Sequence, residues 1–265
     1  MKTLAISLKS NPERYNYIKN HLNDIGLDFE IVDAINGYNL TTQEKEELCD
    51  METVNKYRSW LSDGIIGCSL SHRKALLRML ELDLPYVLIL EDDVILPNNF
   101  KETLIHLEKI IQADEVITLF SGAHQKSALS TVNSINTPYG GLYFPMDINK
   151  TLSTAAYIIG KEAAKKLSDA VLPVRASPDS WGIYYSLNAF SSYRVLFPFI
   201  VGNKAFKSTV AYIHPKSFMG KITHFINKYR IPGLYHILQA RREKIIDDTT
   251  ANFYLCNEKS PIDKS

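Results

Sequence analysis

The chain has 265 residues, an apolar fraction of 45% and a formal net charge of +1 at pH 7. This length allows one domain with a sizeable core, and the near-neutral charge argues against a general binder of polyanions such as nucleic acids. The three cysteines, Cys49, Cys68 and Cys256, lie far apart without a C-x-x-C pair, which argues against a disulfide framework or a structural zinc site. There is no signal peptide and no run long enough to span a bilayer, so we expect a cytoplasmic protein.

The N-terminal third has the pattern of a nucleotide-binding α/β fold. Residues 3–8 predict a strand, which is followed by a helix capped near Ser10 or Asn11 and by a second strand over residues 29–32. Neither a G-x-G-x-x-G motif nor a Walker loop accompanies these elements. A dinucleotide site and a P-loop NTPase are therefore not expected.

Three carboxylates, Glu91, Asp92 and Asp93, directly follow an apolar run at residues 87–90. A run without alternation predicts a strand buried on both faces, and ligands bind at the carboxyl ends of such strands in open α/β sheets. Clustered carboxylates are costly unless a cation neutralises them, and oxygen ligands suit Mn²⁺ or Mg²⁺. If the chain stays extended, Glu91 and Asp93 point the same way. A solvated acidic exit from the strand explains the same residues.

The remaining segments continue the alternation of helices and strands. Two stretches read as loops, residues 57–67 and the long polar excursion 121–149. Helices are predicted over residues 41–51, 69–82, 97–111, 161–170 and, after a turn, 178–187, and strands over residues 115–120, 155–159 and 193–197.

Residues 215–265 differ in composition from the preceding sequence and are expected to form a helical extension. Basic residues lie among bulky apolar ones, and Pro232 with Gly233 predicts a break between two helices. Such a stretch suits peripheral contact with an anionic inner membrane, but packing of two helices on the core with a solvated basic side is favoured, because apolar residues are needed for packing either way.

Several segments together resemble glycosyltransferase family 25. The strongest are Gly-Cys-Ser-Leu-Ser-His at residues 67–72 and Glu-Asp-Asp at residues 91–93. Further matching segments are residues 6–8 with 12–14, 33–34 with Gly37, 153–159 with 163–164, 178–179 and 206–210. The resemblance implies a GT-A-like domain over residues 1–214 with a mostly parallel central sheet.

The implied activity is an inverting, metal-dependent transfer of a hexose from a UDP-sugar to a saccharide acceptor. The acceptor is expected to be lipooligosaccharide or lipopolysaccharide, and galactose is favoured over glucose as the donated hexose. Eukaryotic relatives that glycosylate collagen carry an entry signal and a retention tail, which this sequence lacks.

The resemblance assigns the acidic motif to a divalent cation that binds the diphosphate of the donor. Asp93 is the first choice as a ligand, Glu91 binds the metal or holds the ribose, and Asp92 suits either role. His214 is a further candidate ligand, although it lies beyond the matching segments.

Donor-binding roles fall on the ends of the first two strands and the helix between them. Ser7 and Leu8 would flank the base, Arg14 would reach the uracil or the diphosphate, and Asp33 with Ala34 would meet the uracil or the ribose. A solvent-facing Arg14 and a turn-capping Asp33 are the structural alternatives.

Two further sites complete the expected set. Ser71 and His72 would face the diphosphate or the donor sugar, whereas core packing is the alternative for His72 and a buried structural role is expected for Cys68. Asp179 is the candidate general base, beside Trp181 as a stacking platform for a sugar, and a helix-capping aspartate is the alternative. Asp147, in the long polar excursion, is the reserve candidate for the base.

Two other function classes fit parts of the sequence. A metal-dependent nucleotidyl- or phosphoryltransferase also uses acids at a strand end, but a phosphate-cradling glycine loop is missing. A non-catalytic saccharide-binding protein on the same fold is the other class, and the intact acidic motif argues against it.

Overall fold

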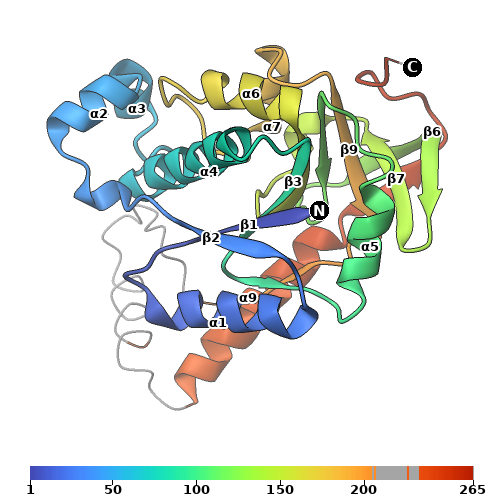
Figure 1. Ribbon diagram of the computed structural model, residues 1–265, viewed down its shortest axis with the longest axis horizontal. Coiled ribbons are helices and arrows are strands. Elements are labelled where there is room, and N and C mark those ends of the chain that lie inside the picture. The colour runs from blue at the N-terminus through green and yellow to red at the C-terminus, as the bar shows by residue number, and fades with distance from the viewer. Residues whose placement is uncertain (205, 207–225, 227–232, 265) are drawn as a thin grey trace.

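The uninterrupted apolar run at residues 87–90 is fully buried, as the sequence predicts. In the computed structural model, which describes residues 1–204, 206, 226 and 233–264, this run belongs to strand β3 (Tyr86–Glu91) of a nine-stranded sheet. The order of the strands is β11-β6-β7-β9-β5-β8-β3-β1-β2 (Figure 1). The strand is covered on both faces, which explains why its sequence shows no alternation.

Parallel pairing places three strand ends at one edge of the sheet. Strand β1 (Lys2–Ser7) pairs parallel with both β2 (Phe29–Asp33) and β3. Strand β8 (Ala156–Gly160) pairs antiparallel with β3 and with β5 (Glu115–Thr118), and β9 (Ser192–Phe197) pairs parallel with β5. The expected α/β class is confirmed, and the carboxyl ends of β1, β2 and β3 lie together.

Helices cover both faces of this part of the sheet, which gives three layers (Figure 1). The core on one face contains residues of α4 (Asp63–Glu81) and α6 (Lys161–Ala170), and that on the other contains residues of α1 (Pro12–Ile25) and α5 (Phe100–Leu107). Successive residues of β3 belong to these two cores in turn, as side chains of a strand must.

Several helices differ in extent from the prediction. The helix expected at residues 41–51 is divided, because Asp50 accepts a hydrogen bond from the amide of Thr53 at 3.1 Å and so starts a new helix. The helix expected at residues 97–111 is shorter. The other elements are α2 (Thr42–Leu48), α3 (Met51–Lys56), α7 (Trp181–Ser186), α9 (Leu234–Thr250), the 3₁₀ turns η1 (Gly37–Asn39) and η2 (Ile148–Lys150), and the two-stranded sheet of β4 (Val94–Ile95) with β10 (Gly202–Asn203).

Helix α4 begins six residues before the predicted start at residue 69, so the second half of the predicted loop 57–67 is helical. Gly67, inside this helix, allows close packing of two backbone segments. A Cβ on Gly67 would lie 2.5 Å from the amide nitrogen of Gly37 and 2.6 Å from the carbonyl oxygen of Ile35. Glycine is needed here because the backbone of α4 directly contacts the loop after β2.

The predicted irregular excursion at residues 121–149 is wrong. It contains strands β6 (Ser127–Thr137) and β7 (Gly140–Pro145), which pair antiparallel with a register shift between Ser130 and Ile135. The polar side chains that resembled a loop have distant partners, since the Ser130 hydroxyl donates to the carbonyl of Glu258 at 2.5 Å.

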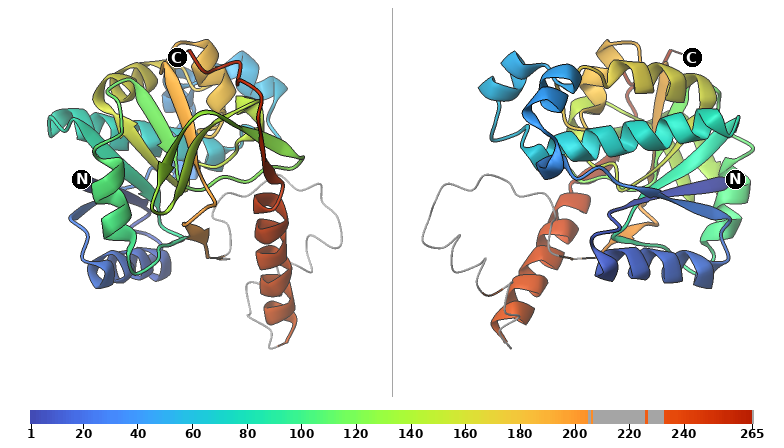
Figure 2. Two further views of the ribbon diagram at one scale, coloured as in Figure 1. Left: turned by 90° about the vertical axis from the view of Figure 1, so that its right-hand side faces the viewer. Right: turned by 60° about the vertical axis from the view of Figure 1, so that its left-hand side comes forward.

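The C-terminal segment is not helical throughout, which corrects the expected extension 215–265. Helix α9 begins directly after Gly233, as predicted, but strand β11 (Phe253–Cys256) pairs parallel with β6 and joins the main sheet. Figure 2 shows α9 extending away from the sheet. Most of residues 205–232, including the first predicted helix and His214, lie outside the described residues.

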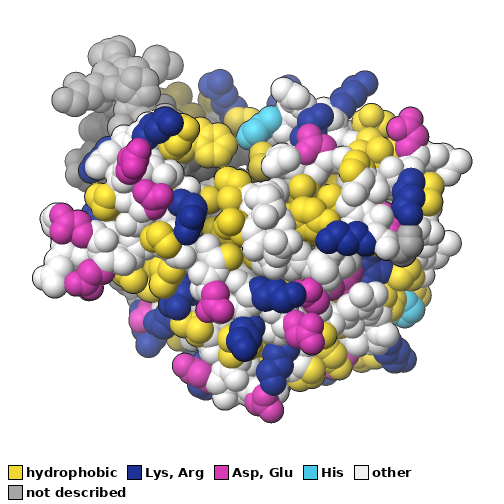
Figure 3. Space-filling model, turned by 90° about the horizontal axis from the view of Figure 1, so that it is seen from above, with side chains coloured by type: hydrophobic (Ala, Val, Ile, Leu, Met, Phe, Trp, Pro, Cys, Tyr) yellow, Lys and Arg dark blue, Asp and Glu magenta, His cyan; other side chains and the backbone are white. Residues whose placement is uncertain are grey.

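The distribution of charged side chains on the surface agrees with the inference from net charge that the protein is not a general binder of polyanions. On the face shown in Figure 3, basic and acidic side chains alternate over the surface rather than gathering into a field of one sign. A broad basic face of the kind that binds nucleic acids is not present on this side. Within the described parts of the chain, no helix has both the length and the apolar character needed to cross a bilayer.

Candidate active site

A cleft lies at the carboxyl ends of β1, β2 and β3, at the edge where the sequence predicts it. We call it the β1–β3 cleft. Residues at the ends of these three strands, Arg14 from the first turn of α1 and residues of α4 form its wall. The lining residues are Ile6, Ser7, Leu8, Arg14, Ala34, Ile35, Asn36, Gly37, Tyr38, Gly64, Cys68, Ser71, His72, Glu91 and Asp92.

Arg14 links α1 to the acidic motif. Its Nε donates to Asp92 Oδ1 at 2.7 Å, its Nη2 donates to Asp93 Oδ2 at 2.7 Å, and the Ser7 hydroxyl donates to Asp92 Oδ2 at 2.7 Å. Only 7% of Arg14 is exposed, so the alternative of a solvent-facing arginine is wrong. The placement of Arg14 follows from a helix start at Pro12, which sets its side chain at the sheet edge.

The acidic motif does not continue as a strand. Strand β3 ends at Glu91, and Asp92 and Asp93 form a turn before β4. The expectation that Glu91 and Asp93 point the same way is therefore wrong, because it required an extended chain. Arg14 instead holds Asp92 and Asp93 together, while Glu91 faces α4.

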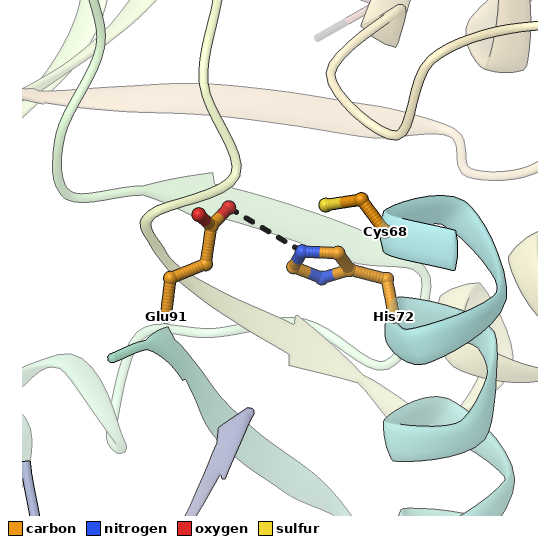
Figure 4. A group of neighbouring side chains, drawn as sticks. All are labelled: Cys68, His72 and Glu91. Carbon is orange, nitrogen blue, oxygen red and sulfur yellow. Dashed lines mark ion pairs between the residues drawn. The ribbon is translucent and has the colours of Figure 1, made fainter. Parts of the chain in front are cut away.

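The side chain of Glu91 contacts polar groups from the loop before β8 and from α4. The Thr154 hydroxyl donates to its Oε1 at 2.7 Å, and His72 Nε2 lies 3.4 Å from the same oxygen (Figure 4). Burial acts to raise the pKa of Glu91, but the contacts with His72 and Thr154 outweigh it, so that the pKa lies below its ordinary value. Glu91 is thus held as a carboxylate.

Asp93 is in a different electrostatic position. Burial raises its pKa to about 7, and Glu91 and Asp92 add to this effect against the opposing charge of Arg14. Its Oδ1 is buried and makes no hydrogen bond within the part of the chain that is described. Asp92 and Asp93 thus share one guanidinium, Glu91 lies close enough for its charge to act on both Arg14 and Asp93, and one oxygen of Asp93 lacks a partner among the described residues. This arrangement fits a divalent cation.

The loop before β8 was not recognised from sequence as part of the site. Ser153 has a φ of 102°, a strained value for a serine, and its amide donates to Asp179 Oδ2 at 3.3 Å. Its carbonyl accepts from Trp181 Nε1 at 3.1 Å, and its hydroxyl accepts from the amide of Ala155 at 3.0 Å. These contacts fix Thr154 against Glu91. In the sequence, this loop is marked only because residues 153–159 are among the segments that resemble glycosyltransferase family 25.

Asp179 lies behind the cleft wall rather than among the lining residues. One oxygen accepts from the Ser177 hydroxyl at 2.6 Å and the other from Ser153. The residue that precedes α7 as its cap is Ser180, so Asp179 is not the helix cap. Trp181 is only 1% exposed and packs on other aromatic rings, so the expectation that it stacks on a sugar is wrong.

The other predicted donor-binding residues divide into two groups. Leu8 and Ala34 line the β1–β3 cleft. The carboxylate of Asp33 accepts from the amide of Lys9 at 3.2 Å, and neither Asp33 nor Asp93 is among the lining residues. The Ser71 hydroxyl lines the cleft and also accepts from the amide of Ile35 at 2.8 Å, which pins the loop after β2 to α4.

His72 and Cys68 both line the cleft, so neither is confined to core packing. His72 Nδ1 lies 3.1 Å from the Tyr157 hydroxyl, and its other nitrogen faces Glu91. Burial raises the pKa of the Cys68 thiol well above its ordinary value, and the charges of Glu91 and Asp179 add to this. Both residues lie on α4 at i and i+4, so their side chains share one face of the helix.

A family model described as glycosyltransferase family 25, LPS biosynthesis protein, matches residues 1–181. The lipooligosaccharide biosynthesis protein lic2B of Haemophilus influenzae is 27% identical over 174 residues, which are 62% of this chain and 61% of that protein. Human procollagen galactosyltransferase 2 is 26% identical over 235 residues, which are 82% of this chain and 35% of that protein. The matched part is thus less than two thirds of either relative.

A second bacterial relative and a solved structure are also similar to this chain. The lacto-N-neotetraose biosynthesis glycosyltransferase LgtB of Neisseria gonorrhoeae is 26% identical over 178 residues, which are 65% of this chain and 62% of that protein. A solved glycosyltransferase involved in the glycosylation of the major capsid of PBCV-1 is 13% identical, with a TM-score of 0.38 over 74% of this chain and 81% of that one. Since the family model covers well over half of the sequence, the chain belongs to glycosyltransferase family 25.

Proposed function

We propose that this protein is an inverting, metal-dependent glycosyltransferase that moves a hexose from a UDP-sugar to a lipooligosaccharide or lipopolysaccharide acceptor. Family membership and the names of lic2B and LgtB, which describe lipooligosaccharide and lacto-N-neotetraose biosynthesis, support the reaction class and the acceptor class. Galactose is favoured as the donated hexose over glucose, a preference that procollagen galactosyltransferase 2 supports by its name alone. The observation that carries the proposal is the arrangement of Arg14 and the three carboxylates at the carboxyl end of the buried strand β3.

The wall of the β1–β3 cleft has an apolar part and a charged part. Ile6, Leu8 and Ala34 supply an apolar surface that suits one face of a uracil ring. Arg14 holds Asp92 and Asp93 in one orientation and reduces their repulsion, so that two carboxylates can stay side by side in a buried site. The Ser7 hydroxyl donates to Oδ2 of Asp92 and so fixes the other oxygen of that carboxylate.

A Mn²⁺ or Mg²⁺ ion would be held by Asp93, with Glu91 or Asp92 as further oxygen ligands. Bound there, the ion would neutralise the negative charge that develops on the diphosphate as it leaves. Asp93 has the partner-free buried oxygen that such an ion requires. His214, the further ligand predicted from sequence, lies outside the described residues.

Asp179 is our candidate general base. It would take the proton from the acceptor hydroxyl while the oxygen of that hydroxyl bonds to the anomeric carbon and the bond from that carbon to the diphosphate breaks. Attack opposite the leaving group inverts the anomeric configuration. Two features support this role. Asp179 is close enough to the cleft for its charge to raise the pKa of Cys68, and its side chain is partly exposed.

The enzyme would work at the cytoplasmic face of the inner membrane, where α9 would give peripheral contact. This helix exposes Leu234, Ile237 and Ile245 next to Arg241 and Lys244, a combination that suits an anionic lipid surface. Cosedimentation with vesicles that contain anionic lipid, compared with neutral vesicles, measures this contact.

Thermal unfolding tests the proposal at low cost. UDP and Mn²⁺ together should raise the Tm more than the sum of the shifts that each gives alone. UDP-galactose, UDP-glucose and UDP-N-acetylglucosamine are then offered with a saccharide acceptor, and release of UDP is measured. Turnover identifies a transferase, whereas binding without turnover would favour a saccharide-binding protein, and loss of the nucleotidyl group would favour a nucleotidyltransferase.

A further inference from the structure

Cys68, His72 and Glu91 form a cluster whose members come from α4 and from the end of β3 (Figure 4). The proposed transfer gives no task to the thiol or to the imidazole. One ligand atom of each residue lies within 4.8 Å of the others. Cys68 and His72 are i and i+4 on one helix, so both side chains point to the same side of α4, and Glu91 closes the group from the sheet.

The spacing of these atoms is close to that of a tetrahedral metal site. In such a site with zinc, neighbouring ligand atoms are roughly 3.3–3.6 Å apart, given bond lengths of about 2.0–2.3 Å. His72 Nε2 and Glu91 Oε1 are 3.4 Å apart, which already matches this edge. Closing the remaining edges to the Cys68 sulfur needs a shift of about 1 Å at most, within reach of a side-chain rotation.

The outer contacts of the cluster are those that a metal site needs. The Tyr157 hydroxyl engages His72 Nδ1 at 3.1 Å, which fixes the orientation of the ring and leaves Nε2 to face the cluster. Thr154 holds Glu91 at 2.7 Å in the same manner. His72 is only 3% exposed, and its Nε2 makes no hydrogen bond in the described part of the chain. A buried nitrogen in this state favours a ligand.

We propose that Cys68, His72 and Glu91 form a binding site for a thiophilic divalent cation such as Zn²⁺. The mixed sulfur, nitrogen and oxygen ligands distinguish this site from the oxygen-only set around Asp93, which suits Mn²⁺ or Mg²⁺. On binding, the Cys68 thiol loses its proton to water and the thiolate bonds to the metal. The thiolate and the carboxylate then balance the two positive charges of the ion.

The ion would regulate the transferase, a consequence that depends on the proposed function. All three ligands line the β1–β3 cleft, so the fourth coordination position would open into the space proposed for the donor. Glu91 would also be withdrawn from the oxygen-only set. Zn²⁺ should therefore compete with UDP, and the apparent Kd for UDP should rise in proportion to the Zn²⁺ concentration above the Kd of this site.

Titration of the full chain with Co²⁺ tests the site directly, because a cobalt–thiolate bond has a charge-transfer absorption band that other ligands do not give. We expect one equivalent of Co²⁺ to produce the band and Zn²⁺ to abolish it by displacement, whereas excess Mg²⁺ should leave it in place. Cys68→Ser should lose the band and bind Zn²⁺ at least roughly 10-fold more weakly. Cys256→Ser, which removes a partly buried thiol on β11, is the matched control and should behave as the wild type.

The proposal is overturned if the wild type gives no band, if Cys68→Ser keeps it or if Cys256→Ser loses it. Glu91→Gln provides a second variant should Cys68→Ser unfold. It should keep the band but need at least roughly 10-fold more Co²⁺ to develop it, and an unchanged titration would also overturn the site. Binding of UDP is measured separately without Zn²⁺, so that failure of the proposed function is distinguished from failure of this site.

Discussion

Thr154 donates its hydroxyl to Glu91 Oε1 at 2.7 Å, which joins the strained loop before β8 to the carboxyl end of β3. The two residues are 63 positions apart in the sequence. The same loop is tied to Asp179 through the amide of Ser153. The acidic motif and the candidate base are thus connected through two adjacent residues, so a disturbance of one should reach the other.

Replacing Thr154 with valine tests this connection. Valine has nearly the same shape but leaves the buried Glu91 oxygen without its donor, which should cost about 1–3 kcal/mol of stability. We also expect a fall in kcat of about 10-fold or more, because the orientation of Glu91 is relaxed. Thr131→Val is the control, since that hydroxyl donates to the carbonyl of Cys256 far from the cleft. Equal loss of activity in both variants would contradict a specific role for Thr154.

Arg14→Lys should lower kcat/KM by roughly 100-fold, because an ammonium group cannot hold Asp92 and Asp93 through separate donors as the guanidinium does. Steady-state kinetics with a UDP-sugar measure this effect. Arg78→Lys is the matched control, since Arg78 also contacts a carboxylate, Glu30, through Nε and Nη2, but at a half-exposed site away from the cleft. If both variants retain wild-type kinetics, the guanidinium of Arg14 has no special part.

The raised pKa of Asp93 predicts a specific dependence of stability on pH. Its pKa is about 7 in the folded protein and about 3.9 in an unfolded chain, so the folded state binds the proton more tightly. The resulting stabilisation is complete below about pH 4 and is lost as the pH rises through 7. Without added metal, Asp93→Asn should therefore gain Tm relative to the wild type between pH 5 and pH 8.

Two measurements check this interpretation of Asp93. Mn²⁺ should reduce the loss of stability that the wild type shows as the pH rises through 7, because a bound cation favours the ionised form of Asp93. Asp83→Asn is the control and should give a Tm difference from the wild type that stays constant from pH 5 to pH 8, since a hydrogen bond and charge from Lys161 lower the pKa of Asp83 and so place its titration below this range. A constant Tm difference between Asp93→Asn and the wild type from pH 5 to pH 8 would show that Asp93 does not titrate as described.

The elements that the sequence predicts well are those whose signal is local. The run at residues 87–90 needs no partner to be recognised as a strand buried on both faces, and it is fully buried. The helix start at Pro12 likewise depends on nearby residues, and it was enough to bring Arg14 to the correct edge of the sheet. The location of the cleft followed from these two elements together.

The errors concern relationships between distant residues. Strand β6 looked irregular because its polar side chains bond to a segment more than 120 residues away. The strain at Ser153 depends on its contacts with Asp179 and Trp181, so the loop could not be recognised from its own sequence. The turn at Asp92 likewise depends on Arg14, which lies 78 positions earlier.

Asp179→Asn tests the candidate base. The amide can still accept the hydrogen bond from Ser177 but cannot take a proton, so transfer should fall by roughly 10²–10³-fold. UDP affinity should fall far less than transfer, because the base acts on the acceptor rather than on the donor, whereas the amide side chain only loses the hydrogen bond from the Ser153 amide. Asp50→Asn, at the start of α3, is the control and should transfer normally, because its amide oxygen can still accept from the amide of Thr53. Normal transfer by Asp179→Asn would exclude this residue as the base.

The central claim is that carboxylates at the end of β3 bind a divalent cation that in turn binds the diphosphate of the donor. Calorimetric titration of UDP into the protein, with and without Mn²⁺, measures this coupling directly. The wild type should bind UDP at least roughly 10-fold more tightly with Mn²⁺, a difference of about 1.4 kcal/mol, and Asp93→Asn should show no such gain. Equal UDP affinity of the wild type in both buffers, or a full Mn²⁺ effect in Asp93→Asn, would contradict the account.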